Sequence, residues 1–268
     1  MEAEGSQVSI VIIAITRDSD YLNSIENQLR MRNRPILIKD WDKSELVKIP
    51  EIGFEKLGTM LPGMLRDRLC DESLNTAAIM QCICLELALI SGHEYANEIK
   101  SDYLRITDKQ LNDVFYQASL RCDMSSIYAS LIRLSRRIDS ITTNVMMRFQ
   151  PQRGILDDTR MTIHEAVIQS LVSKPGAKMS LDELFQQYKK IIIQPPGEAT
   201  LKLEDVLYDL RFGSDRIWKI EAEVGGEGIN NAMEISLFSW NPKTKLASIE
   251  DPYFAFFVRF SRYLVGLI

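Results

Sequence analysis

The side chains that most often carry catalysis and metal binding are scarce in this sequence of 268 residues. It holds two histidines, His93 and His164, and four cysteines, none of which forms a CxxC pair or stands at metal-ligand spacing from a histidine. No GxSxG, HExxH or phosphate-binding glycine loop is present. His164 precedes Glu165, but this pair begins an expected helix, where the carboxylate serves as a cap. We therefore expect a protein that is not an enzyme and that binds no metal or cofactor.

Net charge and apolar runs narrow the class of protein further. The 32 basic and 37 acidic residues leave a net charge of −5, which disfavours a protein built around a nucleic-acid-binding surface. The apolar run 77–90 is interrupted by Gln81 and Glu86 and is shorter than the roughly 20 residues of a membrane span, so it predicts a buried helix. With no basic leader before the first apolar run, we expect an intracellular protein, cytoplasmic or nuclear, with reduced cysteines.

The first 150 residues predict an α-rich domain with a short β-α-β lead. Residues 8–16 and 34–39 have the composition of strands, and the segment between them has apolar residues at helical spacing. We assign 1–52 to this lead and 53–150 to a helical bundle. Within the bundle, Thr107 and Gln110 have the spacing of a capping box at the start of a helix.

The clearest periodic signal predicts one helix over residues 124–145. Its apolar residues recur at alternating steps of three and four, which places them on a single stripe. The flanking positions carry few charges, so we favour packing inside an intramolecular bundle over a self-association seam. The stripe consists of Met124, Ile127, Leu131, Leu134, Ile138, Ile141 and Val145.

Arginines concentrate in the same region. Residues 121–160 hold seven arginines, four aspartates and no lysine, for a local net charge of +3. The arginines fit either a solvated face with acidic neighbours or a patch that binds phosphate or a partner. The members of this expected basic patch are Arg133, Arg136, Arg137, Arg148 and Arg153.

After an expected linker at 151–160, the spacing of apolar residues changes, and we expect a second domain at 161–243. Capping boxes at Thr162–Glu165 and Ser180–Glu183 open two short helices, and a third begins near residue 200. Period-2 segments at 218–224 and 233–237 flank a glycine cluster and predict a hairpin. Three helices followed by a hairpin resemble the winged-helix superfamily, which implies either DNA binding by the third helix or protein docking. Residues 202–216 carry three basic and four acidic side chains, so we favour docking.

Residues 244–268 predict a C-terminal helix that is rich in aromatic side chains. The segment after Asp251 has two arginines and no acid. This helix could pack back onto a domain, which we favour, dock in a groove of a partner, or lie on a membrane surface. The residues that we expect to dock are Phe254, Phe256, Phe257, Phe260 and Tyr263.

Together these patterns predict a mainly α protein with small β elements: an α-rich domain, a winged-helix-like domain and an apolar C-terminal helix. We expect a non-catalytic structural or adaptor subunit of a multiprotein assembly, with protein partners or copies of itself. The alternative is nucleic-acid binding through the arginine-rich helix. Residues 131–132, 137, 142–143 and 145 also resemble a stretch of the helical domain of influenza-type matrix proteins, which implies a self-assembling viral structural protein as a minor alternative.

Overall fold

The computed structural model describes residues 40–93, 103–138, 145–149, 157–161, 163–191, 203–211 and 237–261. The chain divides into two compact units, Met1–Asp40 and Trp41–Ile268. The expected β-α-β strands and helix of the first unit lie outside the described residues. All elements below belong to the second unit, which is mainly helical with a small antiparallel sheet.

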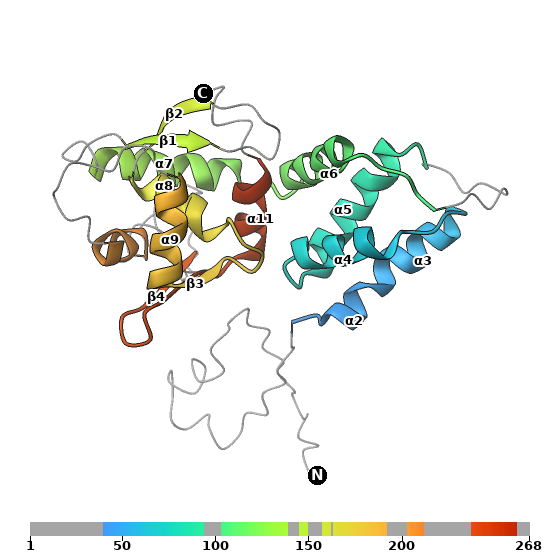
Figure 1. The fold of residues 1–268 in the computed structure, drawn as a ribbon, viewed down its shortest axis with the longest axis horizontal. Coiled ribbons are helices and arrows are strands. Elements are labelled where there is room, and N and C mark those ends of the chain that lie inside the picture. The colour runs from blue at the N-terminus through green and yellow to red at the C-terminus, as the bar shows by residue number, and fades with distance from the viewer. Residues whose placement is uncertain are drawn as a thin grey trace, which may run out of the picture. The chain divides into compact units, whose positions relative to one another are not determined.

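The helical region begins earlier than the expected residue 53 (Figure 1). Its helices are α2 (Lys43–Leu46), α3 (Lys48–Lys56), α4 (Gly63–Glu72), α5 (Ala77–Ile90) and α6 (Asp108–Leu120). The capping box of α6 is confirmed: the Gln110 backbone N–H donates to Thr107 Oγ1 at 3.2 Å, and the Thr107 N–H donates to Gln110 Oε1 at 3.0 Å. These bonds satisfy amides that have no partner within the helix.

One hydrophobic cluster, which we call the bundle core, holds α2 to α6 together. Helix α5 supplies its centre, because Ile79, Met80, Ile83 and Leu87 are fully buried. The helix predicted over 77–90 is thus confirmed with the same bounds. The bundle core consists mainly of Leu46, Phe54, Leu65, Leu69, Ile79, Met80, Ile83, Leu87, Leu111, Val114, Phe115 and Phe256.

The helix predicted over 124–145 is wrong at its C-terminal end. Helix α7 spans Ser125–Ile138, and Val145 begins strand β1 (Val145–Phe149). This strand pairs antiparallel with β2 (Asp157–Met161), with Val145 opposite Met161. Most of β2 therefore lies in the segment that we expected to be a linker. Apolar residues at 145, 147 and 149 also fit the period of a strand, so Val145 satisfied both patterns.

The elements that follow combine helices with a three-stranded sheet. They are α8 (Ile163–Leu171), β3 (Lys178–Ser180), α9 (Leu181–Ile191), a helical segment at 203–211, β4 (Phe238–Asn241) and β5 (Leu246–Ile249). The strand order is β3-β5-β4, with both pairings antiparallel. The predicted capping box of α9 is confirmed, since Ser180 Oγ accepts the Glu183 N–H at 3.3 Å. The strands expected at 218–224 and 233–237 lie outside the described residues, apart from Leu237.

Helix α11 (Pro252–Phe260) closes the described chain. It begins later than the expected residue 244, because β5 occupies 246–249. Asp251 caps it by accepting the Phe254 N–H at 2.8 Å, and Pro252 occupies the first turn, where no amide partner is needed. Among the helices that the structure describes, none has the length and apolar character that crossing a membrane requires.

A second hydrophobic cluster, the sheet core, holds α7, α8, α9, the 203–211 segment and the sheet together. Trp240 on β4 and Phe254 on α11 are its largest fully packed side chains. Its main members are Ile127, Leu131, Val167, Ile168, Leu171, Leu184, Leu207, Leu210, Trp240, Ala247, Phe254 and Phe257.

Candidate functional site

The helical segment 203–211, at the place expected for the third helix of a winged helix, has one buried and one acidic face. Leucine and valine side chains at 203, 206, 207 and 210 lie in the sheet core. On the other face, Asp205 is exposed, and Glu204 Oε1 lies 2.5 Å from Lys245 Nζ. Asp209 Oδ2 lies 3.7 Å from Nε2 of the buried His164 on α8. This segment therefore carries three carboxylates, of which Asp205 and Asp209 are exposed and Glu204 is paired with Lys245.

The segment 203–211 has a single basic residue, Arg211, which is exposed at its C-terminal end and is hydrogen-bonded to the sheet. Arg211 Nη1 donates a hydrogen bond to the backbone carbonyl of Trp240 on β4 at 3.3 Å. A helix that binds DNA needs cationic side chains aimed at phosphates and donors or acceptors aimed at bases. The described face offers carboxylates instead, which suit basic groups of a protein partner.

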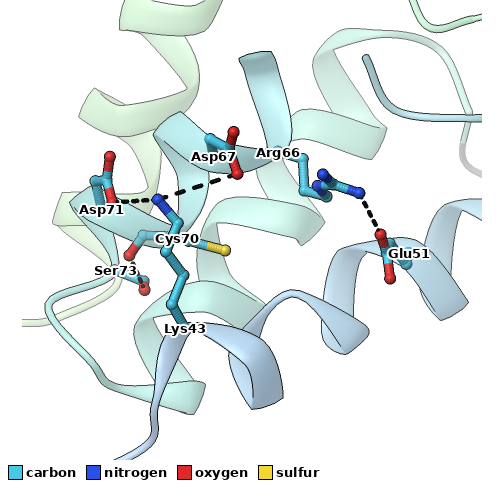
Figure 2. Close-up of polar contacts among 7 residues, drawn as sticks. All are labelled: Lys43, Glu51, Arg66, Asp67, Cys70, Asp71 and Ser73. Carbon is cyan, nitrogen blue, oxygen red and sulfur yellow. Dashed lines mark hydrogen bonds and ion pairs between the residues drawn. The ribbon is translucent and has the colours of Figure 1, made fainter. Parts of the chain in front are cut away.

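A surface cluster of charged side chains joins α2, α3 and α4 (Figure 2). Lys43 Nζ on α2 lies 2.8 Å from Asp71 Oδ1 and 4.0 Å from Asp67 Oδ1, both on α4. Arg66 Nη1 on α4 lies 2.6 Å from Glu51 Oε1 on α3. The hydrogen bond to Asp71 raises the pKa of Lys43, so this ammonium stays charged. Nothing in the sequence pattern predicted this cluster, because its pairs join different helices.

The same cluster contains a thiol, but the thiol is not set up for nucleophilic chemistry. Burial raises the pKa of Cys70, which keeps it protonated, and the thiolate is the reactive form. Ser73 Oγ donates to the Cys70 backbone carbonyl at 2.7 Å and so completes the end of α4 (Figure 2). Burial also raises the pKa of Cys84 and of Cys122 to about 12 each. The cluster is thus best explained as a set of contacts that hold helices together.

A second ionic site is largely buried and connects α4, α8 and α11. Arg259 on α11 donates from Nη2 to Glu72 Oε1 at 2.8 Å, and its Nε lies 2.7 Å from Glu72 Oε2. Its Nη1 donates to the backbone carbonyl of Val172, which follows α8. The two charged side chains are 14% and 10% exposed. One charge-assisted hydrogen bond, from Nη2 to Oε1, and a second close approach of opposite charges therefore hold this pair together.

The aromatic residues expected to dock on a partner are placed inside this chain instead. Phe254, Phe256 and Phe257 are buried, and the Phe260 ring stacks on Phe115 of α6 with ring centroids 4.7 Å apart. The structure thus shows the favoured alternative, packing back onto a domain, for these four residues. Tyr263 lies outside the described residues.

The expected helix-association stripe is brought together only in part. Ile127 and Leu131 are buried in the sheet core, and Met124 packs against it. Leu134 and Ile138 lie on α7, whose side chains are described only as far as Leu131, and Ile141 lies outside the described residues. Val145 is on β1 and cannot continue the stripe.

The residues of the expected basic patch lie on two different elements of the chain. Arg133, Arg136 and Arg137 lie on the C-terminal half of α7, and Arg148 lies on β1 in register with Asp158 of β2. Arg153 lies outside the described residues. The expected patch therefore draws on a helix and a strand, and it remains a prediction because the side chains that would form it lie outside the described part of the chain.

Large apolar side chains reach the surface mainly in the helical region. Sequence reasoning missed them because a helix period does not reveal which stripe stays uncovered. The exposed members are Trp41, Ile52, Met60, Met64, Leu85, Leu89, Tyr103, Leu120 and Phe185. Apolar groups at the surface of a folded domain often mark binding sites.

Neither a protein-family model, nor a curated protein, nor a solved structure matches this chain.

Proposed function

We propose that this chain is a non-catalytic adaptor or structural subunit of a protein assembly. We propose further that the acidic face of segment 203–211 docks a basic protein partner. The observation that carries the proposal is the set of carboxylates at 204, 205 and 209 on a segment whose one arginine is bonded to β4.

The order of elements supports a winged-helix interpretation of residues 163–249. A helix, a short strand, two helical segments and a hairpin follow one another, and the first strand pairs with the last strand of the hairpin. In such a domain the third helix is the usual contact element. Here we infer that it contacts protein, because a face of carboxylates is repelled by a duplex that carries one charge per roughly 1.7 Å of its axis.

The experiment compares partners retained by the wild-type chain and by Asp205→Lys, using quantitative mass spectrometry with chemical cross-linking. Asp205 is exposed and has no part in the core, so the variant should fold with an unchanged melting temperature. The matched control is Glu55→Lys, a reversal of the same sign at an exposed position on α3.

We expect Asp205→Lys to lose roughly fivefold in retention of a partner that cross-links to segment 203–211, since a rim charge contributes about 1 kcal/mol. Glu55→Lys should retain that partner fully. Equal retention by both variants would contradict the proposal. A gel shift with duplex DNA at low salt whose affinity falls steeply as salt rises would favour the nucleic-acid alternative instead.

A further inference from the structure

Helix α5 is apolar on the outside as well as on the inside. Its 14 residues include one charged side chain, Glu86, which is buried and paired with Arg121 at the end of α6. The solvent-facing side chains are Ala78, Gln81, Leu85 and Leu89, with Cys82 partly exposed beside them. Leu85 is 47% exposed and Leu89 is 39% exposed. An amphipathic surface helix places charged residues on this side, so the exposed face of α5 has the composition of a covered one.

The exposed residues have the spacing of a helix-pairing seam. Positions 78, 82, 85 and 89 are separated by four, three and four residues, which is the a/d spacing that keeps one stripe facing a second helix. The stripe predicted for self-association on α7 has Ile127 and Leu131 buried inside the chain. Among the helices whose side chains are described along their whole length, α5 has an uncovered stripe with this spacing.

Side-chain size along the stripe indicates what covers it. The N-terminal half carries the small residues Ala78 and Cys82, and the C-terminal half carries Leu85 and Leu89. When two such stripes pair antiparallel about a two-fold axis between 82 and 85, Ala78 faces Leu89 of the other copy and Cys82 faces its Leu85. Small residues then meet large ones along the whole seam, which is the complementarity that a close-packed interface requires.

We propose that the α5 face binds a second copy of this chain in an antiparallel, two-fold symmetric pair. The face carries no charge that a partner must neutralise, so two copies suit one another without repulsion. This proposal is independent of the acidic face of segment 203–211.

The length of α5 limits the area that the dimer interface can bury, and therefore limits the affinity of the dimer. Fourteen residues of helix extend about 21 Å, so the seam buries less area than the roughly 1,600 Å² of a standard stable interface. We therefore expect a dimer that forms at micromolar concentrations and dissociates on dilution.

Sedimentation-velocity centrifugation of the full chain across a concentration series tests the pairing. Leu89→Ala should raise the dimer dissociation constant about tenfold or more, because the symmetry removes two buried leucines at once. The double variant Ala78→Leu with Leu89→Ala exchanges large for small at facing positions, so it should regain most of the wild-type affinity. The matched control is Met64→Ala, which truncates a side chain that is 89% exposed on α4 and should change nothing.

Three further outcomes would each contradict the proposal. A wild-type chain that remains monomeric up to about 100 µM rules out a second copy as the occupant. A dimer that is insensitive to Leu89→Ala forms through another surface. A dimer that Leu89→Ala weakens but the double variant fails to restore uses α5 in a different register or orientation. Circular dichroism shows whether each variant is folded, and substitutions at these exposed positions should leave it so.

Discussion

Replacing Arg259 by methionine should destabilise the protein more than any comparable change at an exposed ion pair. The guanidinium donates hydrogen bonds to Glu72 Oε1 and to the backbone carbonyl of Val172, and its Nε lies 2.7 Å from Glu72 Oε2. Methionine preserves much of the side-chain volume and removes all of these donors. The Glu72 carboxylate then remains largely buried, at 10% exposure, without its cation.

The expected loss in the free energy of unfolding follows from the burial of the Glu72 carboxylate, which the substitution leaves without its cation. Removing one partner of a buried ion pair costs about 3–5 kcal/mol, because the remaining charge keeps its desolvation penalty and loses its attraction. The Val172 carbonyl adds about 1 kcal/mol for a lost hydrogen bond. The total is a large part of the 5–15 kcal/mol that is typical of a folded domain. Arg66→Met is the matched control, and it should cost about 0–1 kcal/mol because the Arg66–Glu51 pair is solvent-exposed.

Urea unfolding followed by circular dichroism measures both free energies. The double variant Arg259→Met with Glu72→Met should recover all but about 1–2 kcal/mol, since it removes the stranded carboxylate and leaves only the carbonyl unsatisfied. A loss below about 1 kcal/mol for Arg259→Met alone would refute the reasoning. A double variant as unstable as the single one would show that the guanidinium acts through packing and not through Glu72.

Further expected outcomes follow from other contacts. Ser180→Ala should lower the free energy of unfolding by about 1 kcal/mol, measured in urea, because Glu183 loses the hydroxyl that accepts its N–H. Cys84 and Cys122 should resist a thiol reagent at pH 8 until urea unfolds the chain. Their pKa of about 12 lies above the unfolded value of 9.0, so their contribution to stability is present below pH 9 and is lost as the pH rises toward 12. Phe256→Ala should cost about 3–5 kcal/mol in the same urea assay, because the ring is fully buried in the bundle core.

Local signals in the sequence were sufficient for several elements. The apolar run of α5 and the paired cap residues Thr107–Gln110 and Ser180–Glu183 each act within a few neighbouring residues. These signals arise from the hydrophobic effect and from unsatisfied amides at a helix end, and both act locally. They can therefore be recognised without knowledge of the fold. Asp251 and Pro252 form a similar local signal at the start of α11, although the predicted C-terminal helix began at residue 244.

Strands were harder to locate than helices. Val145 fits both a helical stripe and a strand alternation, and only the pairing with Met161 decides between them. The described hairpin turns at residues 242–245, where Asn241 Oδ1 accepts the N–H groups of Lys243 and Thr244. An Asn-Pro pair followed by polar residues is a turn signal that could have found this hairpin. Strand β3 has three residues, too few to show any alternation.

Contacts between distant residues could not have been predicted from one sequence. Arg259 and Glu72 are separated by 187 positions, and each is an ordinary charged residue in its own neighbourhood. The same limit applies to the candidate docking face, because the hydrogen bond from Arg211 to the Trp240 carbonyl and the ion pair between Glu204 and Lys245 each join residues that are far apart in the sequence. A count of charges gives the composition of a face, whereas the fold decides which charges are already engaged.

The aromatic character of α11 has a physical explanation in its position between two hydrophobic clusters. Phe254, Phe257 and Val258 follow the i, i+3, i+4 spacing of one helix face, and all three lie in the sheet core. Tyr253, Phe256 and Phe260, at i, i+3 and i+7, contact the bundle core. A helix that is apolar all round is stable only when both faces are covered, and here each face is covered by a different part of the same chain. The aromatic segment therefore packs back onto this chain, as we favoured from the sequence, and joins the two cores, whereas α5 keeps an apolar face exposed.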